Sequence, residues 1–147
     1  MAVKNAIESA QTVQWDAYPE RIDFRQYNGR IVSSGNDTRP LPYYLVDRGR
    51  CRWFSAAVRD HLFKAGELTI VLLDPDAILG NRGDDLSDNA TIVGAAGTPY
   101  YLLDGLVVRG MTAEVRDYYQ FRNFVDILPT RVFQQYPAGH ELQLPGA

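Results

Sequence analysis

Five charged residues in the last third of the chain are the strongest candidates for chemistry. They lie within fourteen positions of one another, and strand alternation can point several of them into one cavity: Asp104, Arg109, Glu114, Arg116 and Asp117. In an apolar pocket, two carboxyl groups and an arginine can position and activate a water molecule, because burial and charge shift the two carboxyl pKa values in opposite directions. The candidate catalytic set is Asp104, Arg109 and Asp117. Cross-strand ion pairs on an exposed sheet face explain the same charges without any chemistry.

The run 104–122 contains the sequence Val-Arg-Asp-Tyr-Tyr at 115–119. This run resembles the closing strands of the cone-shaped ketosteroid-isomerase-like family, which includes epoxide hydrolases. The resemblance implies a cofactor-free hydrolase or isomerase with an apolar pocket. It covers fewer than twenty residues, and an Asn-Gly pair typical of a hairpin stands where the family has a long N-terminal helix.

Other reactive side chains are few. The chain has two histidines, one cysteine (Cys51), and no Gly-x-Ser-x-Gly sequence, so we expect neither a serine hydrolase nor a thiol hydrolase. The acidic loop 80–89 carries the oxygen donors that calcium prefers, and its weak metal candidates are Asp84, Asp85 and Asp88. Because their spacing does not match an EF-hand, we expect a solvated loop and no cofactor.

Composition excludes several classes of protein. Hydrophobic residues make up 46% of the 147 residues, which favours a folded domain. The net charge is −3 and no block of lysines and arginines is present, so the pattern of a nucleic-acid-binding protein is missing. The chain also lacks an apolar run long enough to span a membrane and an N-terminal secretory signal. We expect a soluble protein that is cytoplasmic at synthesis, with no membrane partner.

Periodicity and turn signals predict the elements. Helical spacing of apolar residues predicts helices over about 3–18 and 51–65. Asn28-Gly29 predicts a hairpin within 21–33, and Asp104-Gly105 predicts a second hairpin with a primed turn. The remaining expected strands cover 43–46, 68–73, 91–95 and a segment that starts at 112, and the strand 68–73 is expected to lie centrally with both faces covered.

These elements predict one α+β domain over 1–147, with a β-rich mixed or antiparallel sheet and one or two short helices. The expected core covers about 20–127, and the proline-containing residues 128–147 form an extended C-terminal arm. We expect no internal repeat.

Tyrosines supply the remaining functional signal. The chain has nine, and neighbouring residues of a strand face opposite sides, so adjacent tyrosines place one ring outward. Exposed tyrosines are typical of protein interfaces, and the candidates are Tyr43, Tyr44, Tyr118 and Tyr136. The leading hypothesis is a non-catalytic structural or assembly subunit that binds other protein subunits, self or hetero, as in a virion or similar particle. The alternatives are the hydrolase or isomerase described above and a small-ligand or sugar-binding module.

Overall fold

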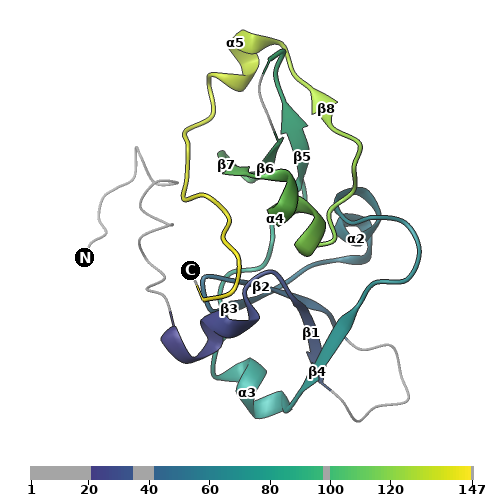
Figure 1. Cartoon of the computed structure of the whole chain (residues 1–147), viewed down its shortest axis with the longest axis vertical. Helices are drawn as coiled ribbons and strands as arrows, with labels where there is room; N and C mark the ends of the chain where they lie inside the picture. Colours follow the sequence, from purple (N-terminus) through teal and green to yellow (C-terminus); the bar gives the residue numbers. More distant parts are fainter. Residues whose placement is uncertain (1–20, 35–41, 98–99, 147) are drawn as a thin grey trace.

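The computed structural model describes residues 21–34, 42–97 and 100–146 of the chain. These residues form two four-stranded sheets and four short α-helices, which confirms the β-rich α+β fold class (Figure 1). The first sheet occupies one half of the molecule and the second sheet the other half. The helix expected over 3–18 lies outside the described residues. Among the described residues, no helix is long and apolar enough to cross a bilayer.

The first sheet has the strand order β3-β2-β1-β4. Its first three strands form an antiparallel meander, and its last strand lies parallel to β1. A helix connects β3 to β4, and a second helix follows β4. The bounds are β1 Ile31–Ser34, β2 Tyr44–Asp47, β3 Arg50–Trp53, α2 Ala56–Leu62, β4 Ile70–Leu73 and α3 Pro75–Leu79. A 3-10 helix, η1 (Ile22–Tyr27), precedes this sheet.

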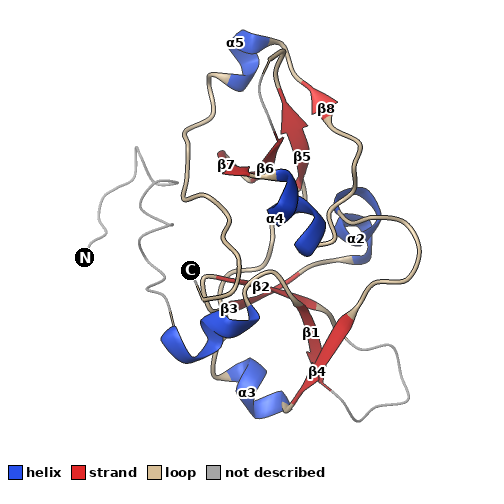
Figure 2. Ribbon diagram, viewed as in Figure 1, coloured by secondary structure: helices blue, strands red, loops and turns tan. Residues whose placement is uncertain are grey.

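The second sheet repeats this topology, with the strand order β7-β6-β5-β8. Again three strands form an antiparallel meander, a helix follows, and the last strand lies parallel to the first strand of the meander. The bounds are β5 Thr91–Gly94, β6 Tyr100–Asp104, β7 Val107–Met111, α4 Ala113–Tyr118, β8 Asp126–Ile127 and α5 Thr130–Phe133. Helices α3 and α5 lie at opposite ends of the molecule (Figure 2).

The sequence also carries this duplication. Residues 42–62 align with residues 99–119 without a gap, and ten of the 21 aligned positions are identical. Both segments begin with Pro-Tyr-Tyr-Leu, and both contain Val-Arg-Asp near their end. The expectation that the chain has no internal repeat is therefore wrong. The repeat is hard to find because the identity is confined to this window and the flanking segments have diverged.

The segments after α3 and α5 are also equivalent. Each returns along the second strand of its hairpin and makes the same two backbone hydrogen bonds: Gly83 N to Cys51 O and Leu86 N to Trp53 O in one half, and Gly139 N to Val108 O and Leu142 N to Gly110 O in the other. We therefore define repeat 1 as residues 31–86 and repeat 2 as residues 92–142. The segment expected to be a C-terminal arm supplies the last part of repeat 2, and its Leu142 is buried.

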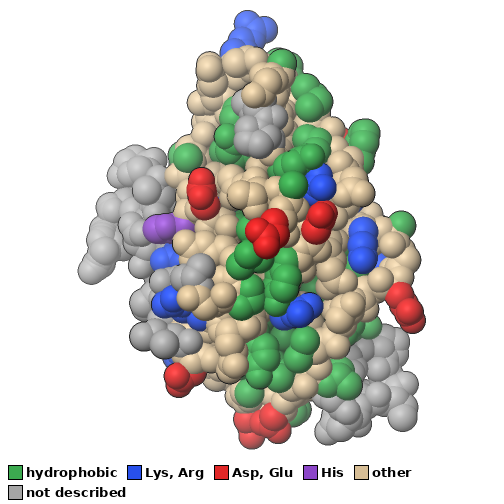
Figure 3. Space-filling view, viewed as in Figure 1, with side chains coloured by type: hydrophobic (Ala, Val, Ile, Leu, Met, Phe, Trp, Pro, Cys, Tyr) green, Lys and Arg blue, Asp and Glu red, His purple; other side chains and the backbone are tan. Residues whose placement is uncertain are grey.

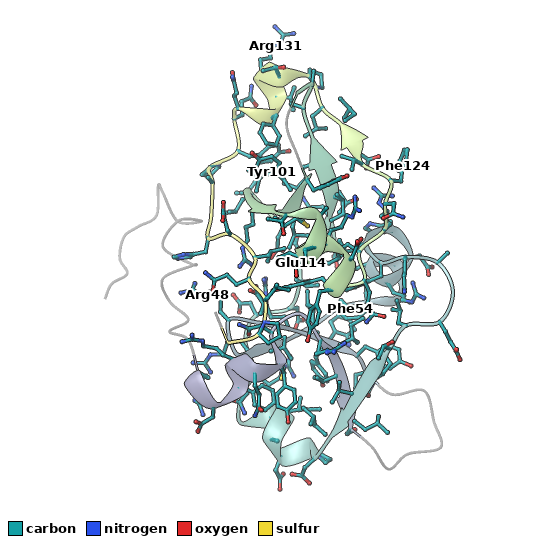
Figure 4. The ribbon with its side chains drawn as sticks, viewed as in Figure 1. Arg48, Phe54, Tyr101, Glu114, Phe124 and Arg131 are labelled. Atoms are coloured by element: carbon teal, nitrogen blue, oxygen red, sulfur yellow. The ribbon has the colours of Figure 1, made fainter. Side chains whose placement is uncertain are left out.

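The two sheets bury their inner faces against each other. We call this shared cluster the central core, and equivalent residues of the two repeats enter it in pairs: Ile31 with Ile92, Leu45 with Leu102, Phe54 with Met111, Val58 with Val115, Leu62 with Tyr119 and Phe63 with Phe121. Phe54 lies in the interior, where the sheets meet (Figure 4). Because the core draws on both repeats, neither repeat buries its inner face alone.

The outer face of the first sheet is covered by η1 and α3, and that of the second sheet by α5. Ile78 of α3 packs on Val46 and Cys51 in repeat 1. Phe133 of α5 packs with Leu103 and Val108 in repeat 2. The two hairpins therefore pack on the central core with one face and on these smaller clusters with the other.

The hairpin expected around Asn28-Gly29 is wrong. Residues before this pair form η1, and the pair leads directly into β1. Gly29 has φ +86°, which suits glycine at the sharp change of direction. The Asn28 side chain does not close a local turn, because its Oδ1 atom accepts a hydrogen bond from Gly49 N in the β2–β3 turn at 2.9 Å.

Three further expectations need correction. The helix expected over 51–65 is a strand followed by a shorter helix, which begins after Ser55, whose hydroxyl accepts from Val58 N at 3.2 Å. The strand expected from 112 is helix α4, because Thr112 caps its N-terminus in the same way. The apolar run 68–73 forms an edge strand, β4, rather than a central one. The strands at 43–46 and 91–95 and the hairpin at Asp104-Gly105 are confirmed.

Candidate functional site

Each repeat carries one aspartate and one arginine at the same places in its hairpin. Asp47 ends β2 and Arg52 lies in β3, while Asp104 ends β6 and Arg109 lies in β7. Both arginines lie opposite a leucine of the central core in the neighbouring strand, so they point to the same side as that core. The duplication therefore brings two aspartates and two arginines to the junction of the repeats.

The ion pairs at this junction run from one repeat to the other. Arg109 donates to both carboxylate oxygens of Asp47, at 2.5 and 3.0 Å. In the opposite direction, Arg52 Nη2 lies 2.7 Å from Asp104 Oδ2. Arg52 Nη1 also donates to Asp47 Oδ2 at 2.9 Å, which joins the four side chains into one network. We call this set the charge network.

Backbone carbonyls complete the charge network in an equivalent way. Arg52 Nε donates to the Asp84 carbonyl at 2.9 Å, and Arg109 Nε donates to the His140 carbonyl at 2.7 Å. These two carbonyls occupy matching positions in the segments that return after α3 and α5. Each arginine therefore ties its own hairpin to the end of its own repeat while it pairs with the other repeat.

Burial and charge fix the ionisation of the charge network. Asp47 is 4% exposed and Arg109 is fully buried. Burial by itself would raise the pKa of Asp47, but the guanidinium groups of Arg109 and Arg52 and their hydrogen bonds outweigh it and hold this pKa well below its usual range. Burial would likewise lower the pKa of Arg52, yet the two carboxylates raise it. Asp47 and Arg52 therefore stay charged at neutral pH, a state suited to joining the repeats rather than to exchanging protons.

The structure separates the three residues of the candidate catalytic set. Asp104 and Arg109 both belong to the charge network, but their charged partners there are Arg52 and Asp47. Asp117 lies exposed on α4, where its carboxylate pairs with Arg116 at 3.2 Å.

Sequence reasoning missed half of the charge network, namely Asp47 and Arg52. The signal was present, because an aspartate precedes an arginine by five positions in both hairpins, within the segments that repeat.

The acidic loop is held by arginines. The Asp85 carboxylate pairs with Arg82 at 3.1 Å, and the Asp84 carbonyl accepts from Arg52. Within residues 21–34, 42–97 and 100–146, no three His, Cys, Asp or Glu side chains are grouped so that they could hold a metal ion, and this range includes the weak candidate Asp88.

The four candidate interface tyrosines differ in exposure. Tyr43 is exposed, whereas the other three are half-buried. Tyr44 lies beneath the guanidinium group of Arg82, Tyr118 lies beneath that of Arg30, and Tyr136 packs on the outer face of the second sheet.

Large exposed apolar side chains lie at several places, among them Leu79 at the end of α3 and two residues on edge strands. Leu72 of β4 is 60% exposed and Ile127 of β8 is 65% exposed. Leu72 pairs with Ser33 in β1, and Ile127 pairs with Gly94 in β5. Ser33 and Gly94 each come directly after an Ile-Val pair in the first strand of their sheet. Leu72 and Ile127 therefore occupy equivalent positions. Phe124, just before β8, is 66% exposed and lies at the periphery (Figure 4). Hydrophobic side chains are visible over both halves of the surface (Figure 3).

The comparisons with known proteins found no match. No protein-family model, no curated protein and no solved structure matches the chain.

Proposed function

We propose that this protein is a non-catalytic assembly subunit that binds other protein chains through the edge strands of its two sheets. A component of a virion or of another large particle is one instance of this class. The observation that carries the proposal is the pair of exposed apolar side chains, Leu72 and Ile127, at equivalent positions on β4 and β8.

The edge strand β4 has the chemistry of a protein-binding surface. β4 and β8 are the last strands in their sheets, and an edge strand offers backbone groups that a strand of another chain can pair with. Natural edges are usually protected by charges or prolines, but β4 consists of Ile-Val-Leu-Leu. An exposed leucine in such an edge favours contact with another chain.

The number and placement of the edges also support the proposal. β4 lies toward one end of the molecule and β8 toward the other (Figure 1). Two equivalent edges that face different directions allow a subunit to contact two neighbours at once, which is what extension of an assembly requires.

The catalytic alternative has less support. A water-activating site needs a carboxylate that can take up a proton near neutral pH. Asp104 is ion-paired with Arg52, and Asp117 lies exposed next to Arg116 on a different element. The two carboxylates have different partners, and no feature of their surroundings favours a shared substrate site.

The test is the mass of the protein in solution by light scattering, at two widely separated concentrations. We expect the native chain to form oligomers as its concentration rises, and we expect a variant with Leu72→Lys and Ile127→Lys to stay monomeric. Leu106→Lys is the matched control, because Leu106 is 61% exposed but lies in the β6–β7 turn rather than on β4 or β8.

Chemical crosslinking of the same samples shows whether the associated species are of discrete size. A native chain that stays monomeric at both concentrations, or an edge variant that associates as the native chain does, would count against the edge strands as the assembly surface.

A further inference from the structure

We propose that two copies of this chain can exchange repeats, so that repeat 1 of each copy packs against repeat 2 of the other in a domain-swapped dimer. This inference concerns the junction between the repeats. It does not rest on the edge strands, and its partner is a second copy of the chain.

The junction has the form of an interface between two identical subunits. In such an interface, residue i of one subunit contacts residue j of the other, and j contacts i in return. The charge network follows this rule: the aspartate of repeat 1 pairs with the arginine of repeat 2, and the aspartate of repeat 2 pairs with the arginine of repeat 1.

A symmetric interface must also bring some residues against their own equivalents. Phe63 and Phe121 follow α2 and α4, and their backbone N–H groups donate to the carbonyls of the aligned residues Arg59 and Arg116, so they occupy equivalent places. Their ring centroids lie 5.5 Å apart, and their backbones form an antiparallel bridge. These two residues therefore mark the approximate two-fold axis between the repeats.

The connection between the repeats is short. Repeat 1 ends at Leu86 and repeat 2 begins at Ile92, so residues 87–91 alone join the two units along the chain. The interface between the repeats does not depend on which chain supplies each repeat. Exchange therefore keeps the interface and alters only the path of this connection.

The hydrogen bonds of the connection locate the hinge. Leu86 N donates to Trp53 O in repeat 1, whereas Ser87 N donates to Asp104 Oδ1 in repeat 2 at 2.9 Å. Asn89 is also held by repeat 2, through two hydrogen bonds to the Gly105 backbone at 2.9 and 3.1 Å. Residues 87–90 thus move with repeat 2, and the hinge lies between Leu86 and Ser87.

Charge reversal can make exchange the only route to a matched interface. The first variant reverses the charges of repeat 1, with Asp47→Arg and Arg52→Asp. The second variant reverses the charges of repeat 2, with Asp104→Arg and Arg109→Asp. Within either variant alone, both contacts between the repeats join like charges. In a swapped dimer of the two variants, one junction joins the two reversed repeats and the other joins the two native repeats, so opposite charges meet at both.

The experiment refolds the two variants separately and together from denaturant, and it measures mass and composition by native mass spectrometry. We expect neither variant alone to form the folded 16.6 kDa monomer. We expect the mixture to give a folded dimer of about twice that mass that contains one copy of each variant. The control is a single chain with all four substitutions, which restores opposite charges within one molecule. A folded control chain together with a mixture that gives no mixed dimer would overturn the proposal.

A second measurement covers the case in which the four-substitution chain does not fold. Isotope-labelled and unlabelled native chains are refolded together at high concentration, and separately folded samples are mixed for comparison. We expect mixed dimers that persist on dilution only after joint refolding, because exchange requires the central core to open. No mixed dimer, or mixed dimers that form rapidly from folded chains, would contradict exchange. Repeating the experiment with Leu72→Lys and Ile127→Lys separates it from assembly through the edges, because those substitutions leave the junction intact.

Discussion

Replacing Asp47 by asparagine tests whether the charge network joins the repeats. The substitution keeps the size of the side chain but removes the carboxylate that Arg109 and Arg52 share. Arg109 is fully buried, so its positive charge would lose its buried counter-ion. Removing one partner of a buried ion pair costs about 3–5 kcal/mol, which is a large part of the roughly 5–15 kcal/mol that stabilises a domain. We expect Asp47→Asn to lower the free energy of unfolding by this amount at neutral pH.

The pH dependence gives a second, independent readout. The folded-state pKa of Asp47 lies below the unfolded-state value of about 3.9. A carboxyl group whose pKa is lowered by folding stabilises the protein above the unfolded-state pKa, and this contribution is lost as the pH falls toward the folded-state value. At about pH 3, the native chain should have lost about 1 kcal/mol of the contribution from Asp47. The asparagine variant cannot show this loss.

The assay is urea denaturation of the native chain and the variant near neutral pH and at about pH 3. Asp117→Asn is the control, because this aspartate is exposed and its carboxylate pairs with a neighbouring arginine on its own helix. It should change stability by less than about 0.5 kcal/mol. If Asp47→Asn lowers the free energy of unfolding by less than about 1 kcal/mol and shows the same loss of stability at acid pH as the native chain, then the charge network does not hold the repeats together.

Three further results are expected. Phe63→Ala should lower the free energy of unfolding by about 3–5 kcal/mol, measured with heat or urea, because Phe63 is buried at the axis between the repeats. Phe124 is exposed, so Phe124→Ala should change the free energy of unfolding by less than about 0.5 kcal/mol. Equal losses would contradict the assignment of the core. Burial raises the pKa of the Cys51 thiol to about 12. A thiol reagent at mildly alkaline pH should therefore label Cys51 in urea but not in the native protein. Rapid labelling of the native protein would disprove the burial of Cys51. The Gln120 side chain accepts a hydrogen bond from Thr69 N at 2.7 Å and donates one to Thr69 O at 3.0 Å. Gln120→Ala should therefore lower the free energy of unfolding by about 1 kcal/mol and speed hydrogen exchange of the Thr69 amide. An unchanged exchange rate would exclude these two hydrogen bonds.

Local chemistry made some elements predictable. Asp104-Gly105 specifies a tight turn because glycine accepts the positive φ that the turn requires, and the flanking apolar residues then pair as strands. The strands at 43–46 and 91–95 were predictable for a similar reason. They are short apolar runs next to turn-forming residues.

The wrong elements have a common cause. The segment 51–65 has apolar residues at helical spacing, but its first part pairs with β2 and becomes β3. The spacing of apolar residues in a short segment does not show which strand is available to pair with that segment. In the same way, the apolar run that became β4 looks like a central strand, and only the sheet topology places it at an edge.

The candidate site was half predictable. The sequence singled out Asp104 and Arg109, which do lie in one network, but it grouped them with Asp117 on the assumption that all three lie on strands. Thr112 instead starts a helix, which turns Asp117 away. Asp47 and Arg52 escaped notice because they are far from the other two along the chain, and the internal repeat that relates the two pairs was missed.

The sequence by itself determined the fold class and the tight turn at Asp104-Gly105, because these depend on residues that are close together in the chain. The tertiary structure decided that the hairpins face each other, that their inner faces form one core, and that each aspartate pairs with the arginine of the other repeat. Those contacts join residues more than fifty positions apart, and their energy depends on burial and on the distance between charges. Neither quantity exists until the two repeats have packed together.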